Sequence, residues 1–102
     1  MTLKEELTKK LTAKKQADWL KSVSIVEENM EFLKRRVREG LNYLADQGEV
    51  QGYLKDGDIF GGDAKWNDQT KGLAKDRLAR WLTSEGLKVQ TGKDLFVDGW
   101  EK

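Results

Sequence analysis

Leucines recur at every fourth position near the start of the chain, at Leu3, Leu7 and Leu11. This spacing predicts an amphipathic helix over residues 1–21. The apolar positions that continue the same face more weakly are Ala13, Ala17 and Leu20. Lysines cover much of the remaining surface, at Lys4, Lys9, Lys10, Lys14 and Lys15. Because the apolar face is narrow, we expect this helix to need a partner surface.

A capping-box pattern predicts that a second long helix begins at Ser24. Ser24 precedes Glu27 by three residues, so each side chain can bind the backbone N–H of the other. Apolar residues then recur at spacings of three and four, which predicts one continuous buried face. These residues are Val26, Met30, Leu33, Val37, Leu41 and Leu44. Gly48 is a natural end for the helix.

Glycines are frequent between residues 49 and 67. The pair Asp56-Gly57 lies between the apolar pairs Tyr53-Leu54 and Ile59-Phe60. Because Asp-Gly favours tight turns, this pattern predicts a short β-hairpin, followed by a loop over residues 61–68.

The last third of the chain predicts a helix and a second hairpin. The helix begins at residue 67 or 70 and ends near residue 85, before Gly86. Its expected buried edge consists of Ala74, Leu78, Trp81 and Leu82. The hairpin is indicated by two alternating apolar pairs, Leu87/Val89 and Leu95/Val97, on either side of a glycine-containing turn.

These elements together predict an α+β fold. It contains two long N-terminal helices, a Gly-rich segment with a short hairpin, a third helix and a C-terminal β-hairpin. At 102 residues, the chain has the size of a single domain, 1–102. Within it, we expect residues 24–102 to form the helix–hairpin–helix–hairpin core and the Lys-rich helix 1–21 to be a segment that could detach.

Composition narrows the classes of function. The 19 basic and 18 acidic residues nearly cancel, which argues against bulk electrostatic binding. The chain contains no cysteine, so it has no disulfide framework. The acidic start and the absence of a long apolar run argue against a signal peptide or a membrane span. We therefore expect a cytoplasmic protein that does not associate with membranes.

The absence of histidine removes imidazole-based catalysis, and no cofactor-binding motif is found. Asp56, Asp58 and Asp63 are the only cluster that suggests a metal site, and they could converge on one ion. An EF-hand interpretation fails because Phe60 and Asn67 occupy ligand positions. We favour a structural role for these carboxylates, since aspartate and glycine are preferred in turns, and we expect a protein that is not an enzyme.

Tryptophans provide the next candidates. Trp81 lies on the apolar edge of the third helix, and Trp100 could close the end of the core. Trp66, beside Lys65 in a polar loop, could fold back over the core or serve as an exposed anchor for a partner.

We expect an accessory or regulatory function through protein–protein contacts, with another protein or a second copy as partner. The candidate interaction residues are Leu3, Leu7, Leu11 and Trp66. The narrow apolar face of the first helix suits docking or pairing. In general character, the short, charged, cysteine-free chain resembles small bacterial or phage accessory proteins.

DNA binding is the alternative function. The third helix and the following hairpin resemble the recognition helix and wing of a winged-helix module, over residues 70–85 and 87–98. This resemblance implies phosphate contacts on both sides of a groove. The residues that would make them are Arg77, Arg80, Lys88 and Lys93.

Overall fold

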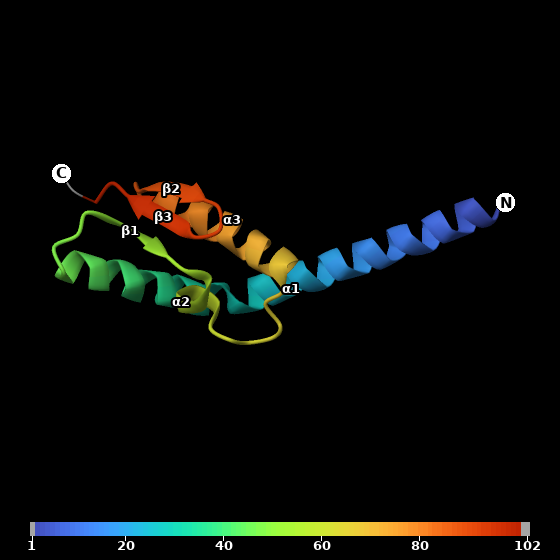
Figure 1. Cartoon of the computed structure of the whole chain (residues 1–102), viewed down its shortest axis with the longest axis horizontal. Coiled ribbons are helices and arrows are strands. Elements are labelled where there is room, and N and C mark those ends of the chain that lie inside the picture. Colours follow the sequence, from blue (N-terminus) through green and yellow to red (C-terminus); the bar gives the residue numbers. More distant parts are fainter. Residues whose placement is uncertain (1, 101–102) are drawn as a thin grey trace.

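The computed structural model describes residues 2–100, which form three helices and a three-stranded sheet (Figure 1). In chain order, the elements are α1 (Leu3–Asp46), β1 (Gln51–Leu54), α2 (Asp56–Phe60), α3 (Asp68–Ser84), β2 (Lys88–Thr91) and β3 (Leu95–Asp98). The sheet is antiparallel with the order β1–β3–β2. The expected α+β class is confirmed.

A single helix of 44 residues replaces the two long helices expected from the sequence, so that prediction is wrong. The segment 20–24 contains neither proline nor glycine, and its backbone can therefore continue helical hydrogen bonding. Ser24 lies inside α1, where its pattern with Glu27 caps no helix end. The helix begins instead after Thr2, whose hydroxyl oxygen accepts a hydrogen bond from the backbone N–H of Glu5 at 3.2 Å. The boundary between residues 1–21 and 24–102 is therefore not a break in secondary structure.

The hairpin expected around Asp56-Gly57 is also wrong. These two residues open the short helix α2, and the Asp58 carboxylate accepts a hydrogen bond from the backbone N–H of Lys55 at 3.4 Å. Ile59 and Phe60 are both buried. A one-sided strand would expose one of two consecutive side chains, whereas a helical turn can bury both.

The third helix and the C-terminal hairpin form as the sequence predicts. The Asn67 side chain caps α3 by accepting a hydrogen bond from the backbone N–H of Thr70 at 2.9 Å. Gly86 follows the helix with a positive φ of 91°, which a glycine adopts at little cost. The strand β1 joins the hairpin by pairing with β3, so that Leu54 lies opposite Leu95.

The hydrophobic core lies between the helices and one face of the sheet. Its buried apolar residues are Val26, Leu33, Val37, Leu54, Ile59, Phe60, Trp66, Ala74, Leu78, Leu82, Leu95 and Val97. Trp100 packs against this cluster, as expected, and its indole N–H donates to the Glu49 carbonyl oxygen at 2.9 Å. Only the part of α1 that follows residue 21 contributes to the core.

The molecule is elongated because α1 extends far beyond the core. Its principal dimensions are 63 × 24 × 20 Å, and Figure 1 shows the first half of α1 leaving the other elements behind. Ser22 is the first buried residue of α1, and its hydroxyl donates to the Gln69 side chain at 3.3 Å. Residues 3–21 are called the projecting segment below.

Candidate protein-interaction surface

Leu3, Leu7 and Leu11 form a leucine stripe along the projecting segment. Their exposed fractions are 70%, 56% and 55%, respectively. At 3.6 residues per turn, positions four apart lie one above the next on the same side of a helix. No described element packs over this stripe, so three large apolar side chains face solvent together.

The projecting segment is more basic than the chain as a whole. It contains six lysines and three acidic residues, which gives a net charge of +3 against +1 for the entire chain. The acidic residues are Glu5, Glu6 and Asp18. Lys14 forms an ion pair with Asp18 at 2.8 Å, and both side chains are largely exposed, so this pair adds little stability. Lysine side chains therefore surround the apolar stripe on this segment.

A shallow groove lies where the projecting segment meets α3. It has a volume of about 270 Å³, and its lining includes Trp19, Val23, Leu73, Arg77 and Arg80. Trp19 is 46% exposed, unlike the buried tryptophan at position 66. The groove therefore lies on the side of α1 that faces α3, apart from the leucine stripe.

Trp66 is buried, with only 5% of its surface exposed. Its ring centre lies 4.9 Å from that of Phe60. Of the two alternatives considered for Trp66, the structure thus contradicts an exposed anchor and shows a side chain folded over the core. It does not join the surface formed by the leucine stripe.

The four basic residues considered for DNA contacts lie on α3 and the hairpin. Arg77 forms an ion pair with Glu27 of α1 at 3.0 Å. Arg80, Lys88 and Lys93 are exposed. Arg77 and Arg80 line the groove beside α1, whereas Lys93 lies at the turn between β2 and β3. The helix and the hairpin therefore carry separate basic groups.

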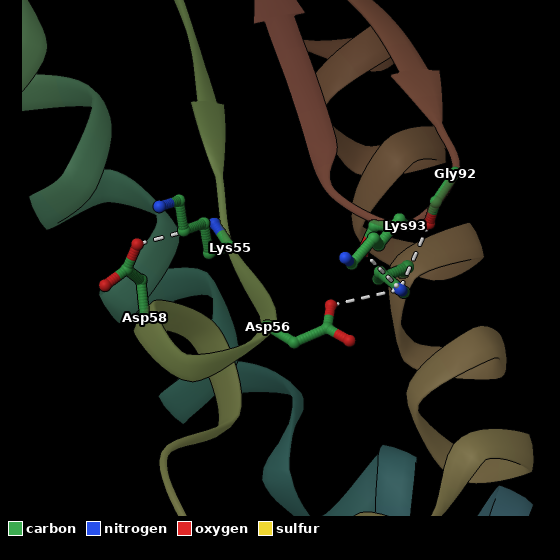
Figure 2. Close-up of polar contacts among 6 residues, drawn as sticks. Lys55, Asp56, Asp58, Gly92 and Lys93 are labelled. Carbon is green, nitrogen blue, oxygen red and sulfur yellow. Dashed lines mark hydrogen bonds and ion pairs between the residues drawn. The ribbon is translucent and has the colours of Figure 1, made fainter.

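A different lysine connects α2, α3 and the hairpin. The Lys75 ammonium group lies 3.0 Å from a carboxylate oxygen of Asp56. It also donates to the carbonyl oxygens of Gly92 and Lys93, both at 3.2 Å. Figure 2 shows Asp56 and the two turn residues converging on this point. Lys75 therefore fixes the hairpin turn and is itself neutralised.

The carboxylates of Asp56, Asp58 and Asp63 do not converge on one point. Asp56 binds Lys75, Asp58 caps α2, and Asp63 accepts a hydrogen bond from the backbone N–H of Lys65 at 3.1 Å. In Figure 2, Asp56 and Asp58 lie at separate places on α2. Among residues 2–100, no group of three acidic side chains is arranged to hold a metal ion.

Sequence reasoning did not single out Phe32, which is 49% exposed on the outer side of α1. The sequence signal for its exposure is that Phe32 falls outside the three- and four-residue spacing of apolar positions that includes Met30 and Leu33. Arg36 lies over the Phe32 ring, with its guanidinium carbon 5.7 Å from the ring centre. Lys34 and Arg38 lie over the Trp81 ring, at 5.4 and 5.3 Å from its centre.

Within the described part of the chain, no helix combines the length and apolar character required to cross a bilayer. No protein-family model, curated protein or solved structure matches the chain. The residues and their geometry are therefore the basis for assigning a function.

Proposed function

We propose that this protein is a non-enzymatic accessory protein that acts through protein–protein contacts made by the projecting segment. The observation that carries this proposal is the solvent-exposed leucine stripe, over which no other described element packs. Burying the exposed part of a leucine side chain favours association, by about 25 cal/mol for each Å² of apolar surface removed from water before the entropic costs of binding. A helix that presents such residues at four-residue spacing suits a helix-in-groove or helix-on-helix contact.

The charge of the segment indicates the chemistry of the partner surface. Lysines flank the leucine stripe, and the net charge of residues 3–21 is +3. A partner with an apolar ridge or groove bordered by carboxylates is complementary to this surface. We also propose that this contact takes place in the cytoplasm, because a cysteine-free chain requires no oxidising compartment.

Site-specific photo-crosslinking tests the proposal. A photoreactive amino acid is placed at Leu7, within the stripe, or at Gln16, on the opposite side of the same helix. We expect protein adducts from a nuclease-treated lysate of the source cells at Leu7, and few at Gln16. The Leu7→Asp substitution should abolish binding without loss of helicity, since Leu7 lies outside the core. Equal labelling at both positions, or none at Leu7, would contradict the proposal.

DNA binding remains the second candidate function, and the topology favours it. The order α1–β1–α2–α3–β2–β3, with β3 between the other strands, resembles that of a winged-helix module. However, α2 and α3 are separated by residues 61–67, a longer connection than the turn of about 3–4 residues in a helix-turn-helix. In addition, Asp68 and Asp76 stand beside Lys71 on α3 and reduce its attraction for phosphate.

A mobility-shift experiment with duplex DNA tests this second candidate. Salt-sensitive binding that is lost in Arg77→Ala/Arg80→Ala would support it. The Leu7→Asp variant is the matched control, because a winged-helix contact through α3 and the hairpin leaves the leucine stripe free. Absence of a shift at low salt would eliminate DNA binding through this face.

A further inference from the structure

The exposed side of α1 continues beyond the leucine stripe along almost the whole helix. At 3.6 residues per turn, one stripe about 60° wide contains exposed residues from both halves of α1. Representative members are Leu3, Leu7, Lys14, Glu28, Phe32 and Glu39. Leu11 and Glu31, also exposed, border this outer stripe on either side. Ile25, which also lies in this stripe, is partly buried against the core, whereas the members named above are exposed.

Charge is distributed unevenly along the outer stripe and its borders. The half on the projecting segment carries Lys10, Lys14 and Lys21, whereas the half beside the core carries Glu28, Glu31 and Glu39, together with one basic residue, Arg35. All of these side chains are exposed. Two copies aligned in parallel would place lysines against lysines and glutamates against glutamates. Antiparallel copies would instead bring the basic half of each helix against the acidic half of the other.

We propose that the outer stripe docks a second copy of this chain, with the two α1 helices antiparallel. This inference rests on the proposed function and identifies its partner. When the helices cross near residue 21, the facing residues have numbers that add up to about 42. Lys10 then faces Glu31, and Lys14 faces Glu28. The same register places Leu11 against Phe32 and thereby covers two exposed apolar side chains at each end of the dimer.

The shape of the molecule permits this arrangement. The projecting segment of each copy lies along the acidic half of the other copy's α1, where the outer stripe is open. Its 19 residues span about 28 Å, a length that matches residues 22–39 of the partner helix. Glu6 in the first turns then lies near Arg35, so the opposite signs also match at the far end of the contact.

Charge reversal tests the pairing. In one variant, Lys10→Glu/Lys14→Glu makes the basic half acidic; in the other, Glu28→Lys/Glu31→Lys makes the acidic half basic. Each variant alone should dimerise at least about tenfold more weakly than the wild type, because like charges then face each other. An equimolar mixture should recover the dimer, since each altered residue in the mixed pair then faces a residue of opposite charge. Sedimentation equilibrium at about 0.05 M and about 0.5 M salt measures the dimer dissociation constant of each variant. The higher salt concentration should weaken the wild-type dimer.

A matched control separates this specific pairing from a general effect of charge. Lys9→Glu/Lys15→Glu makes the same change in net charge, but both positions lie off the outer stripe. We expect its dimerisation constant to stay within about threefold of the wild-type value. Circular dichroism of every variant verifies that α1 remains helical.

Disulfide formation tests the direction of the helices, because the chain contains no native cysteine. A mixture of Leu11→Cys and Phe32→Cys chains should form a disulfide-linked heterodimer under mild oxidation. Leu11→Cys alone should not, because its two cysteines would be about 30 Å apart in the antiparallel dimer. Efficient linkage between two Leu11→Cys chains would overturn the antiparallel arrangement.

Two outcomes separate the inference from the proposed function. A chain that remains monomeric, while Leu7 still crosslinks to a different protein, would overturn the second-copy partner and leave the proposed function standing. Loss of the dimer together with the Leu7 adducts would overturn this inference and the proposed function alike.

Discussion

The hydroxyl oxygen of Thr70 lies 3.1 Å from that of Ser22, and both side chains are buried where α3 begins beside α1. Thr70 also lies 2.8 Å from the capping oxygen of Asn67. This cluster therefore links the N-cap of α3 to the point at which α1 enters the body. It defines where the projecting segment begins.

Thr70→Val should destabilise the protein by about 1–3 kcal/mol. Valine fills nearly the same space, but it leaves the buried Ser22 oxygen without the Thr70 hydroxyl. Ser22→Ala should cost less, about 0.5–1 kcal/mol, because Thr70 keeps its bond to Asn67. Urea denaturation measures both values, and the double variant should cost less than the sum if the two hydroxyls interact. A fully additive double variant would contradict the contact.

Two helical glycines should respond differently to substitution by alanine. Gly72 lies within α3, and a Cβ atom there would meet nothing within 4 Å. Gly72→Ala should therefore stabilise the protein by about 0.5–1 kcal/mol, through the higher helix propensity of alanine.

Gly40 of α1 provides the contrast, because its added Cβ would lie 2.7 Å from a methyl carbon of buried Leu54. We expect Gly40→Ala to gain less than Gly72→Ala, or to destabilise the protein, since the displaced leucine must find space in the core. Thermal unfolding monitored by circular dichroism measures the difference. Equal stabilisation by both substitutions would show that α1 and β1 are not closely packed at this point.

The spacing of apolar residues predicted much of the core, as Leu33 and Leu78 illustrate. Both lie on stripes with a helical period, and both are fully buried. The hairpin of β2 and β3 was also predictable, because Leu87/Val89 and Leu95/Val97 recur at alternate positions on either side of a glycine-containing turn, and Val89 pairs with Val97. These features depend on local sequence, which the pattern records directly.

Other features depend on contacts between distant segments or on competition between local signals. The sequence analysis missed that α1 continues through Ser24. A capping pattern indicates where a helix could begin, but the same residues can also lie inside a longer helix. The pairing of Leu54 with Leu95 joins residues far apart in the chain, and nothing local in either segment specifies it. For the candidate site, the spacing identified the leucine stripe, whereas the burial of Trp66 required the fold to be known.

Substitution of a buried tryptophan should cost more stability than substitution of a half-exposed one. Trp66→Ala should cost about 3–5 kcal/mol, because it removes a buried ring that packs on Phe60. Trp19→Ala should cost less than about 1.5 kcal/mol, since this ring is 46% exposed. Denaturant unfolding measures the two costs, and Trp66→Phe provides a conservative control with an intermediate loss. A smaller cost at Trp66 than at Trp19 would contradict the burial of Trp66.

Lys75, which fixes the hairpin turn, should contribute more to the free energy of unfolding than Arg77, which pairs with α1. The Lys75 side chain is 11% exposed and binds Asp56 together with two carbonyl oxygens of the turn. Lys75→Met keeps the aliphatic stem but leaves these three acceptors without their shared donor, so we expect a loss of about 1–3 kcal/mol. Arg77→Met removes an ion pair whose side chains are 45% and 57% exposed, and this loss should stay below about 1 kcal/mol. Urea denaturation at low and high salt measures both, and salt should reduce the Arg77 contribution more strongly. An equal cost for the two substitutions would show that Lys75 does not hold the turn in solution.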